Sequence, residues 1–390
     1  MSQLLHRAAS TARIAAIRSS LSLLGLRGVR QLARGSMDHV GMILMFHHVA
    51  PPRSGRLSIN RGLEVTPETL DRVVSSLMAQ DYDIVPMDAV PERLAQASAG
   101  RRRFAALTFD DGCRDTLLHA APVLVRHGVP FTIYVTTGFA SGHVAPWWHV
   151  VERAALAATS LTVETNAGRQ WFDTASPFKK KRAAEALQGI LWRACEPMRA
   201  QQTAALAAQA GLDLHALTRE LYMDWRELVE IAALPGCAIG AHTESHARLA
   251  DLDEAAVMQE IGEPRDVIRK RLGIEARHFS YPYGVAGACE QREFTLARTA
   301  GFATAVTTRR GVLTQTDIAG LTSLPRVPIN GHYQRQAMID ALVCGLPMVL
   351  AAQTRALLGA MRDGARHQRT LQTDRAAISS RRQFHSPERL

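Results

Sequence analysis

Phe104-Ala-Ala-Leu-Thr-Phe-Asp-Asp-Gly112 joins a short apolar run to two adjacent carboxylates and a glycine. A continuous apolar run of this length is typical of a strand that is covered on both faces. A helical pattern follows over 114–126, and Gly128 is a suitable residue to end it. We therefore interpret residues 104–128 as one strand–helix unit with polar groups at the carboxyl end of its strand.

The same kind of unit recurs along the chain. Helical patterns separate further apolar runs at 41–46, 82–85, 131–136, 237–241, 278–281, 302–306 and 324–327. Repeated strand–helix units favour a parallel sheet with right-handed crossovers. Seven or eight of them predict an α/β fold, a (β/α)7–8 barrel that is closed or nearly closed.

The spacing of these strand–helix units divides the chain into regions. Residues 36–361 are expected to form the barrel, and 143–222 are expected to form a helical insertion, because they separate two strands by far more than a usual connection. Residues 1–35 read as a basic amphipathic helix or a loosely ordered leader. Residues 362–390 lack an apolar period and read as a flexible basic tail.

Composition excludes several classes of protein. Of 390 residues, 47% are hydrophobic and 21% charged, which is ordinary for a globular chain and excludes whole-chain disorder or a collagen. The net charge of +10 lies at the two ends, since 1–35 holds six Arg and no acid and 362–390 holds seven Arg and three acids. A nucleic-acid-binding fold would more often carry its charge on a folded face, so no specific nucleic-acid partner is expected.

Residues 1–35 and the cysteines indicate the cellular compartment. The apolar residues of 1–35 are interrupted by Arg, unlike a secretory signal, and no run approaches the roughly 18 apolar residues of a spanning helix. The five cysteines lack CxxC spacing and read as reduced thiols. We expect a cytoplasmic protein in which 1–35 is a plain leader, a peripheral contact with the inner membrane or a targeting peptide.

Residues with reactive or metal-binding side chains gather after the predicted strands. Asp110 and Asp111 follow one strand, His242 and His246 follow another, and His47 follows the first. In a parallel barrel these carboxyl ends form one rim. The two histidines are four residues apart and would face one side of a helical turn, so with a carboxylate they form an open three-ligand metal site. The competing reading makes one aspartate a helix cap and Gly112 a turn residue.

Three motifs in order carry a resemblance to a known family. Thr-Phe-Asp-Asp-Gly at 108–112, His-Thr-Glu-Ser-His at 242–246 and Tyr-Pro-Tyr-Gly at 281–284 resemble those of the polysaccharide deacetylases. This family is also called the NodB-homology or carbohydrate esterase 4 family, and the resemblance spans about residues 40–345. It implies a distorted (β/α) barrel with a divalent metal, Zn²⁺ first, and the removal of N-acetyl groups from amino sugars, as chitooligosaccharide deacetylases do.

The resemblance also implies roles for individual residues. Asp111, His242 and His246 would be the metal ligands, and Asp110 would be the general base. The backbone N–H of Tyr283 would stabilise the developing oxyanion. A general acid must then protonate the leaving amine.

The sequence departs from the commonest family pattern at two places. Ser280 stands near the position where many members have an arginine, and Arg326 stands in the region of a late Leu-x-His. We expect Arg326 to supply the cation beside Asp110 and His47 to supply the acid, with His332 as the runner-up. The competing readings are a surface ion pair for Arg326 and a structural His47.

These expectations leave three functions to compare. The first is hydrolysis of N-acetyl groups on a polysaccharide or oligosaccharide. The second is the same reaction on a lipid-linked oligosaccharide at the membrane, which the arginine-rich leader suggests. The third is a non-catalytic glycan-binding or scaffold protein on a degenerate barrel, which the two departures suggest.

Overall fold

The computed structural model describes residues 2–33, 39–52, 55–57, 59–97, 102–165 and 168–354. The side chains of 2–11 and of Ala33 are not described. The basic tail expected over 362–390 lies outside the described residues.

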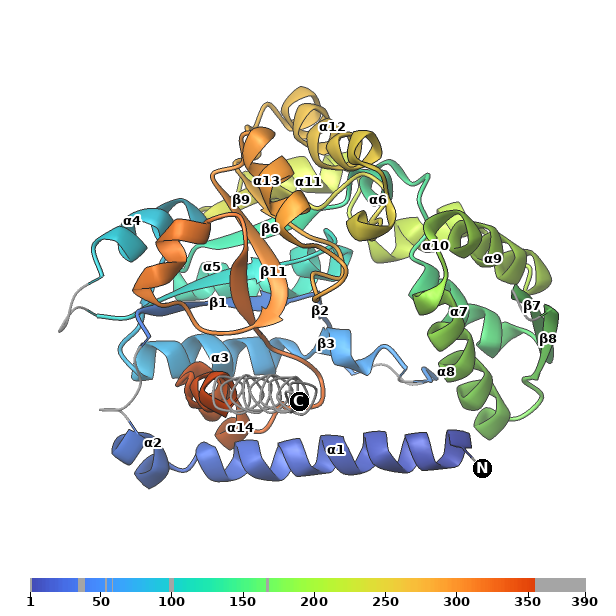
Figure 1. Cartoon of the computed structure of the whole chain (residues 1–390), viewed down its shortest axis with the longest axis horizontal. Helices are drawn as coiled ribbons and strands as arrows, with labels where there is room; N and C mark the ends of the chain where they lie inside the picture. Colours follow the sequence, from blue (N-terminus) through green and yellow to red (C-terminus); the bar gives the residue numbers. More distant parts are fainter. Residues whose placement is uncertain are drawn as a thin grey trace, which may run out of the picture.

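Seven parallel strands close into a barrel, in agreement with the sequence prediction (Figure 1). Neighbours around the barrel follow chain order, and the first strand pairs with both β12 and β5. The strands are β1 (Gly41–Phe46), β5 (Phe104–Phe109), β6 (Phe131–Val135), β9 (Cys237–Ala241), β10 (His278–Ser280), β11 (Thr304–Arg310) and β12 (Leu324–Pro328). The remaining predicted strand, β4 (Asp83–Ile84), pairs only with the first residues of β5.

The apolar runs form central strands because they are buried on both faces. Every residue of β1 and β5 is buried, and the two strands run in register from Gly41 opposite Phe104 to Phe46 opposite Phe109. Gly41 is needed there, since a Cβ would lie 2.7 Å from the Phe104 ring. This register brings the carboxyl ends of β1 and β5, with His47 and Asp110, to the same level of the barrel.

Helices cover the outside of the barrel. Thr66 caps the helix α3 (Pro67–Ala79) by accepting a hydrogen bond from Thr69 N–H, and left-handed Gly128 ends α5 (Ala121–His127). Polar caps and a glycine end are the usual ways to satisfy helix termini. The others are α4 (Val90–Ala95), α6 (Thr137–Ser141), α11 (Trp225–Ala232), α12 (Glu254–Leu272), α13 (Gln291–Thr299) and α14 (Gln336–Val343), with a π-helix at Thr116–Ala120.

The insertion between β6 and β9 forms a lobe on the right flank of Figure 1. It consists of α7 (Trp147–Ala157), the hairpin β7–β8 (Ser160–Thr165 and Gly168–Asp173), α8 (Pro177–Arg193), α9 (Glu196–Gln209) and α10 (Leu214–Leu221). Its apolar core continues into the barrel through Cys113 and Phe139. The lobe therefore shares a core with the barrel and is held against it.

The leader forms two helices, α1 (Ser2–Leu24) and α2 (Arg27–Ala33), along the lower edge of Figure 1. Helix α1 packs on α14, and its Leu21 is buried in the main apolar core. Within the described residues no single helix has the length and hydropathy to cross a membrane. Gln336–Val343 and Leu346–Thr354 reach that threshold only as a pair bent by 60°.

Candidate active site

Three side chains from two loops meet at the carboxyl end of the barrel. Asp111 follows β5, and His242 and His246 lie in the loop after β9. Asp111 Oδ1 lies 3.2 Å from His242 Nε2 and 3.4 Å from His246 Nε2, with all three side chains buried or nearly so. The structure therefore brings together the three residues expected as metal ligands.

The orientation of His242 leaves its Nε2 lone pair facing this cluster. His242 Nδ1 lies 2.7 Å from the carbonyl oxygen of Ser280, which fixes the proton on Nδ1 when the ring is neutral. Asp111 Oδ1 is buried and has no well-formed hydrogen bond, although both imidazoles face it. Ligand atoms at 2.0–2.2 Å from a tetrahedral ion lie about 3.3–3.6 Å apart, close to the separations observed here. The donor set and its spacing fit a divalent metal such as Zn²⁺.

Charge in this cluster also favours a cation. Burial alone would raise the pKa of Asp111, but the nearby imidazoles of His242 and His246 hold it well below its usual value. Burial opposes a charge on His242, yet the neighbouring Asp111 and Asp110 raise the pKa of its ring. Two buried carboxylates require positive charge nearby, and Arg326 neutralises only one of them.

Asp110 is paired with a fully buried arginine. Arg326 Nη1 and Nη2 donate to the two oxygens of Asp110 at 2.8 and 2.6 Å. Its remaining donors bind Thr307 O, Thr108 Oγ1 and Ser280 Oγ. Burial would raise the pKa of Asp110, but the Arg326 guanidinium keeps it below its ordinary value, so the carboxylate is ionised at neutral pH. The side chain of Arg326 is 0% exposed, which excludes a surface ion pair.

Backbone strain is concentrated at this rim. Asp111, Thr243, His246 and Tyr283 all have φ between 58° and 72°, a left-handed conformation that costs energy in residues other than glycine. At Tyr283 the strained turn holds the carbonyl oxygen against Thr308 Oγ1. Within the described part of the chain nothing accepts a hydrogen bond from Tyr283 N–H. This N–H therefore remains available to a bound group.

His47 lies in the cleft and His332 does not. His47 Nε2 is 3.9 Å from Asp110 Oδ2, and the ring lines the same cavity as Asp111. Burial lowers the pKa of His47 more than Asp111 and Asp110 raise it, so the resting ring is neutral. His332 is instead half-buried beside Gly62 and Tyr333, outside the residues that line the cleft.

A matching family model covers residues 97–188 and 200–304, which is half of the chain, and its description is polysaccharide deacetylase. The chain belongs to the polysaccharide deacetylase family. The motifs around Asp111 and His242 both lie inside the matched ranges. Membership makes the chain a relative of metal-dependent hydrolases, and the Asp-His-His cluster is where a divalent ion would be held.

Solved structures support the deacetylase fold at low sequence identity. A Streptococcus pyogenes deacetylase, PplD in complex with acetate, has a TM-score of 0.52 and 16% identity, covering 78% of this chain and 99% of its own. A polysaccharide deacetylase from Bacillus cereus has a TM-score of 0.50 and 14% identity, with 78% and 69% covered. No curated protein matches the sequence.

The cleft of this deacetylase-family chain is walled partly by the insertion. A cavity of about 560 Å³ opens above the Asp-His-His cluster. Trp147 and Trp148 at the start of α7 and Trp192 near the end of α8 line it, together with Gln188. Tyr283 joins this wall, because its hydroxyl accepts a hydrogen bond from Trp147 Nε1 at 3.0 Å. The lobe therefore contributes aromatic faces to the cleft.

A second group of potential ligands lies close behind the first. His48, Cys113 and Asp115 are buried and near enough to one another to hold an ion. However, His48 Nδ1 lies 2.8 Å from Asp115 Oδ2, and His48 Nε2 lies 3.0 Å from His149 Nε2. Both ring nitrogens of His48 already have protein partners, so we interpret this group as a hydrogen-bonded link between the barrel and α7.

Sequence reasoning missed the groups that orient the expected residues. The carbonyl of Ser280 fixes His242, and the hydroxyls of Ser280 and Thr108 hold Arg326. Every residue has a backbone carbonyl, so the sequence could not indicate that the carbonyl of Ser280 would contact His242. Trp192 was also missed, because its place in an alanine-rich helical pattern gave no reason to put it near the cleft.

Proposed function

We propose that this chain is a metal-dependent N-deacetylase that acts on amino-sugar polysaccharides or oligosaccharides. The observation that carries the proposal is the convergence of Asp111, His242 and His246 beside the ionised Asp110 at the floor of an open cleft. A purely structural role for these residues would not explain why the buried Asp111 Oδ1 has no hydrogen-bond partner. The family supports the same reaction class.

The ion supplies chemistry that the chain lacks. Asp111, His242 and His246 would hold a divalent ion, with Zn²⁺ as the first candidate, and this ion would lower the pKa of a water molecule and polarise the acetyl carbonyl. Asp110 accepts the proton of the attacking water. Arg326 keeps that carboxylate ionised and fixes both of its oxygens, so the base cannot rotate away.

The remaining steps fall to Tyr283 and His47. Tyr283 N–H donates to the oxyanion that develops on the acetyl carbonyl. His47 is neutral at rest, so the proton that it gives to the leaving amine must first reach it from the water through Asp110, 3.9 Å away. Acetate and a free amino sugar are then the products.

The walls of the cleft suggest the substrate class. The cleft is lined by flat aromatic side chains and by the polar Asn60 and Gln188, a mixture that suits an N-acetylated sugar, which has apolar ring faces and polar edges. The Streptococcus pyogenes neighbour was solved with acetate, the product of such a reaction. A lipid-linked oligosaccharide is the second substrate class.

Acetate release tests the proposal. Metal-loaded wild type should release acetate from N-acetylglucosamine oligomers or from a lipid-linked acetylated oligosaccharide. Asp110→Asn should keep the metal and lose about 10²–10⁴-fold in turnover, because it removes the base. Binding of these glycans by metal-loaded wild type without acetate release would favour the non-catalytic alternative and contradict the proposal.

A further inference from the structure

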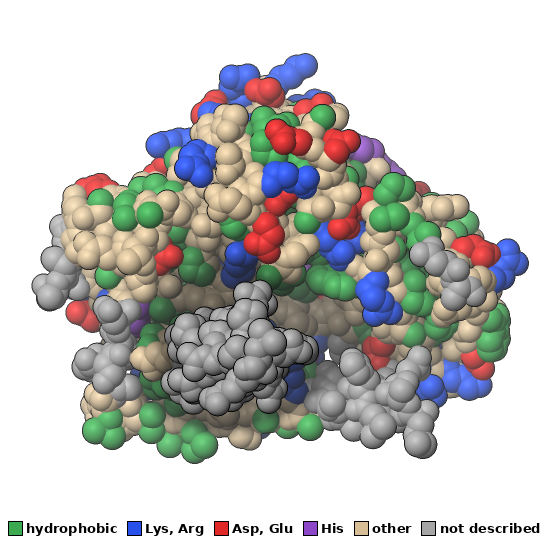
Figure 2. Space-filling model, in the orientation of Figure 1, with side chains coloured by type: hydrophobic (Ala, Val, Ile, Leu, Met, Phe, Trp, Pro, Cys, Tyr) green, Lys and Arg blue, Asp and Glu red, His purple; other side chains and the backbone are tan. Residues whose placement is uncertain are grey.

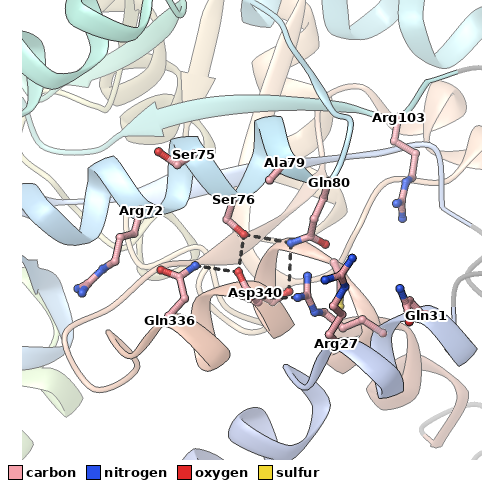
Figure 3. Close-up of a pocket in the computed structure, with 12 residues that line it drawn as sticks. Arg27, Gln31, Arg72, Ser75, Ser76, Ala79, Gln80, Arg103, Gln336 and Asp340 are labelled. Carbon is pink, nitrogen blue, oxygen red and sulfur yellow. Dashed lines mark hydrogen bonds and ion pairs between the residues drawn. The ribbon is translucent and has the colours of Figure 1, made fainter.

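A second cavity lies between the leader helices and the barrel. It has a volume of about 520 Å³, is lined by residues of α2, α3 and α14 together with Arg103, and shares no residue with the active-site cleft. Figure 3 shows it as a space bordered by arginine, glutamine and serine side chains. Nothing in the proposed deacetylation uses it.

The cavity carries an excess of positive charge. Four arginines line it, against one carboxylate, Asp340. Asp340 is already engaged, because it accepts from Ser76 Oγ at 2.7 Å and pairs with Arg30 at 3.2 Å. Among the described residues no carboxylate pairs with the other three arginines, which are Arg27, Arg72 and Arg103. The pocket therefore has a charge that an anion would balance.

These cations come from separate elements and are partly held in place. Arg103 stacks on the Tyr82 ring at 4.7 Å and lies 3.3 Å from His39 Nε2. In Figure 3 Arg103 comes from above the cavity and Arg27 from α2 below it. Planar guanidinium groups that approach from opposite sides match the several oxygens of a phosphate group.

An apolar edge accompanies the pocket. Leu23 at the end of α1, Leu26 in the turn that follows it and Leu32 on α2 are 63%, 52% and 87% exposed. Figure 2 shows hydrophobic side chains along the lower left edge of the molecule, where Figure 1 places these helices. Exposed leucines beside arginines are typical of a helix that lies in a membrane interface.

We propose that this pocket binds the phosphate of an anionic membrane lipid while the exposed leucines of α1, α2 and the turn between them enter the bilayer surface. The arginine pocket and the exposed leucines would act together, since the binding energies of apolar insertion and of contact with anionic headgroups add. A nucleic acid would use the arginines but would leave three exposed leucines without a function. The membrane is therefore the partner that uses both features.

Vesicle co-sedimentation of the full chain tests the inference. Wild type should bind phosphatidylcholine vesicles that contain phosphatidylglycerol, and bind vesicles of phosphatidylcholine alone far more weakly. Arg27→Gln with Arg103→Gln should lower the partition coefficient roughly thirtyfold, because each basic residue near an anionic surface contributes substantially to binding. Arg27→Gln alone should lower it several-fold, and it serves as the safer variant because Arg27 is exposed on α2.

A matched control separates the pocket from net charge. Arg226→Gln with Arg298→Gln removes the same charge from exposed positions on α11 and α13, which Figure 1 places on the opposite side of the barrel. This control should bind like wild type. Equal losses in both double variants, or unchanged binding in the pocket variants, would overturn the proposal.

Two further comparisons identify the ligand. Glycerol phosphate should release wild type from vesicles better than chloride at equal ionic strength, and equal release would refute phosphate coordination. Stabilisation of wild type by free glycerol phosphate without vesicle binding would refute the lipid as its source. If the pocket variants lost affinity for single-stranded RNA and kept their vesicle binding, the membrane proposal would also fail.

Discussion

At the scale of single residues, the site depends on how Arg326 is used. All five of its N–H groups have acceptors, two of them the oxygens of Asp110, and the pair is buried. Removing one partner of a buried pair leaves an uncompensated charge, which costs far more than the pair itself contributes. Arg326 therefore matters both to the stability of the chain and to the protonation of the base.

Arg326→Met should lower the free energy of unfolding by about 3–5 kcal/mol, measured by urea denaturation. It should also raise the pKa of Asp110, because the cation that holds it down is gone. The base is then ionised only at higher pH, so the acidic limb of the pH–rate profile should move upward. Adding Asp110→Asn should restore much of the stability. A variant with wild-type stability and an unshifted profile would contradict this role.

The two candidate acids can be separated at the same scale. His47→Ala should leave metal content intact and cut turnover by about 10²–10⁴-fold, since the leaving amine loses its proton donor. His332→Ala is the matched control and should act like wild type, because His332 lies outside the cleft. Metal analysis and acetate release check both variants. Normal turnover in His47→Ala would remove His47 from the mechanism.

At the scale of elements, a close contact fixes the leader on the barrel. Gly25 lies between α1 and α2, and a Cβ there would be 1.7 Å from the carbonyl oxygen of Ala337 on α14. Gly28, three residues later, has nothing within 4 Å of the same position. Only the first glycine is therefore required for docking.

Gly25→Ala should detach α1 and α2 from α14, whereas Gly28→Ala should leave them docked. Hydrogen exchange should then speed up over residues 12–32 in the first variant only, while acetate release stays unchanged in both, since the leader lies outside the active-site cleft. Equal exchange in the two variants would mean that this contact does not hold the leader.

The elements also show what the sequence can and cannot predict. The strand at Phe104–Phe109 was predictable because burial on both faces requires a continuous apolar run. The pairing of His48–Val49 with Glu64–Val65 was not, since two-residue strands carry no pattern. The contacts of the hairpin Ser160–Thr165 and Gly168–Asp173 with α9 could not be anticipated either, because they depend on how distant segments pack.

The active site, too, has parts that the sequence could predict and parts that it could not. Asp111, His242 and His246 could be expected to meet, because the carboxyl ends of parallel strands share one rim. Arg326 lies in β12, and its burial depends on the partners that closure of the barrel brings to it from β5 and β10. Such long-range partners are set by topology, so local sequence could suggest the pairing with Asp110 but not its five hydrogen bonds.

At the scale of the whole molecule, the two proposals assign separate roles to two cavities. The insertion and the carboxyl rim of the barrel line the cleft proposed to bind the glycan, and α2, α3 and α14 line the basic pocket proposed to bind a lipid phosphate. The two cavities share no residue, so changes in one should leave the other intact. Both proposals can therefore fail independently.

The metal site is tested most directly by an anomalous diffraction measurement on crystals of the full chain grown with Zn²⁺. We predict one strong peak at about 2.0–2.2 Å from Asp111 Oδ1, His242 Nε2 and His246 Nε2. No peak at these atoms, or a peak held instead by His48, Cys113 and Asp115, would contradict a metal-dependent mechanism at Asp111, His242 and His246.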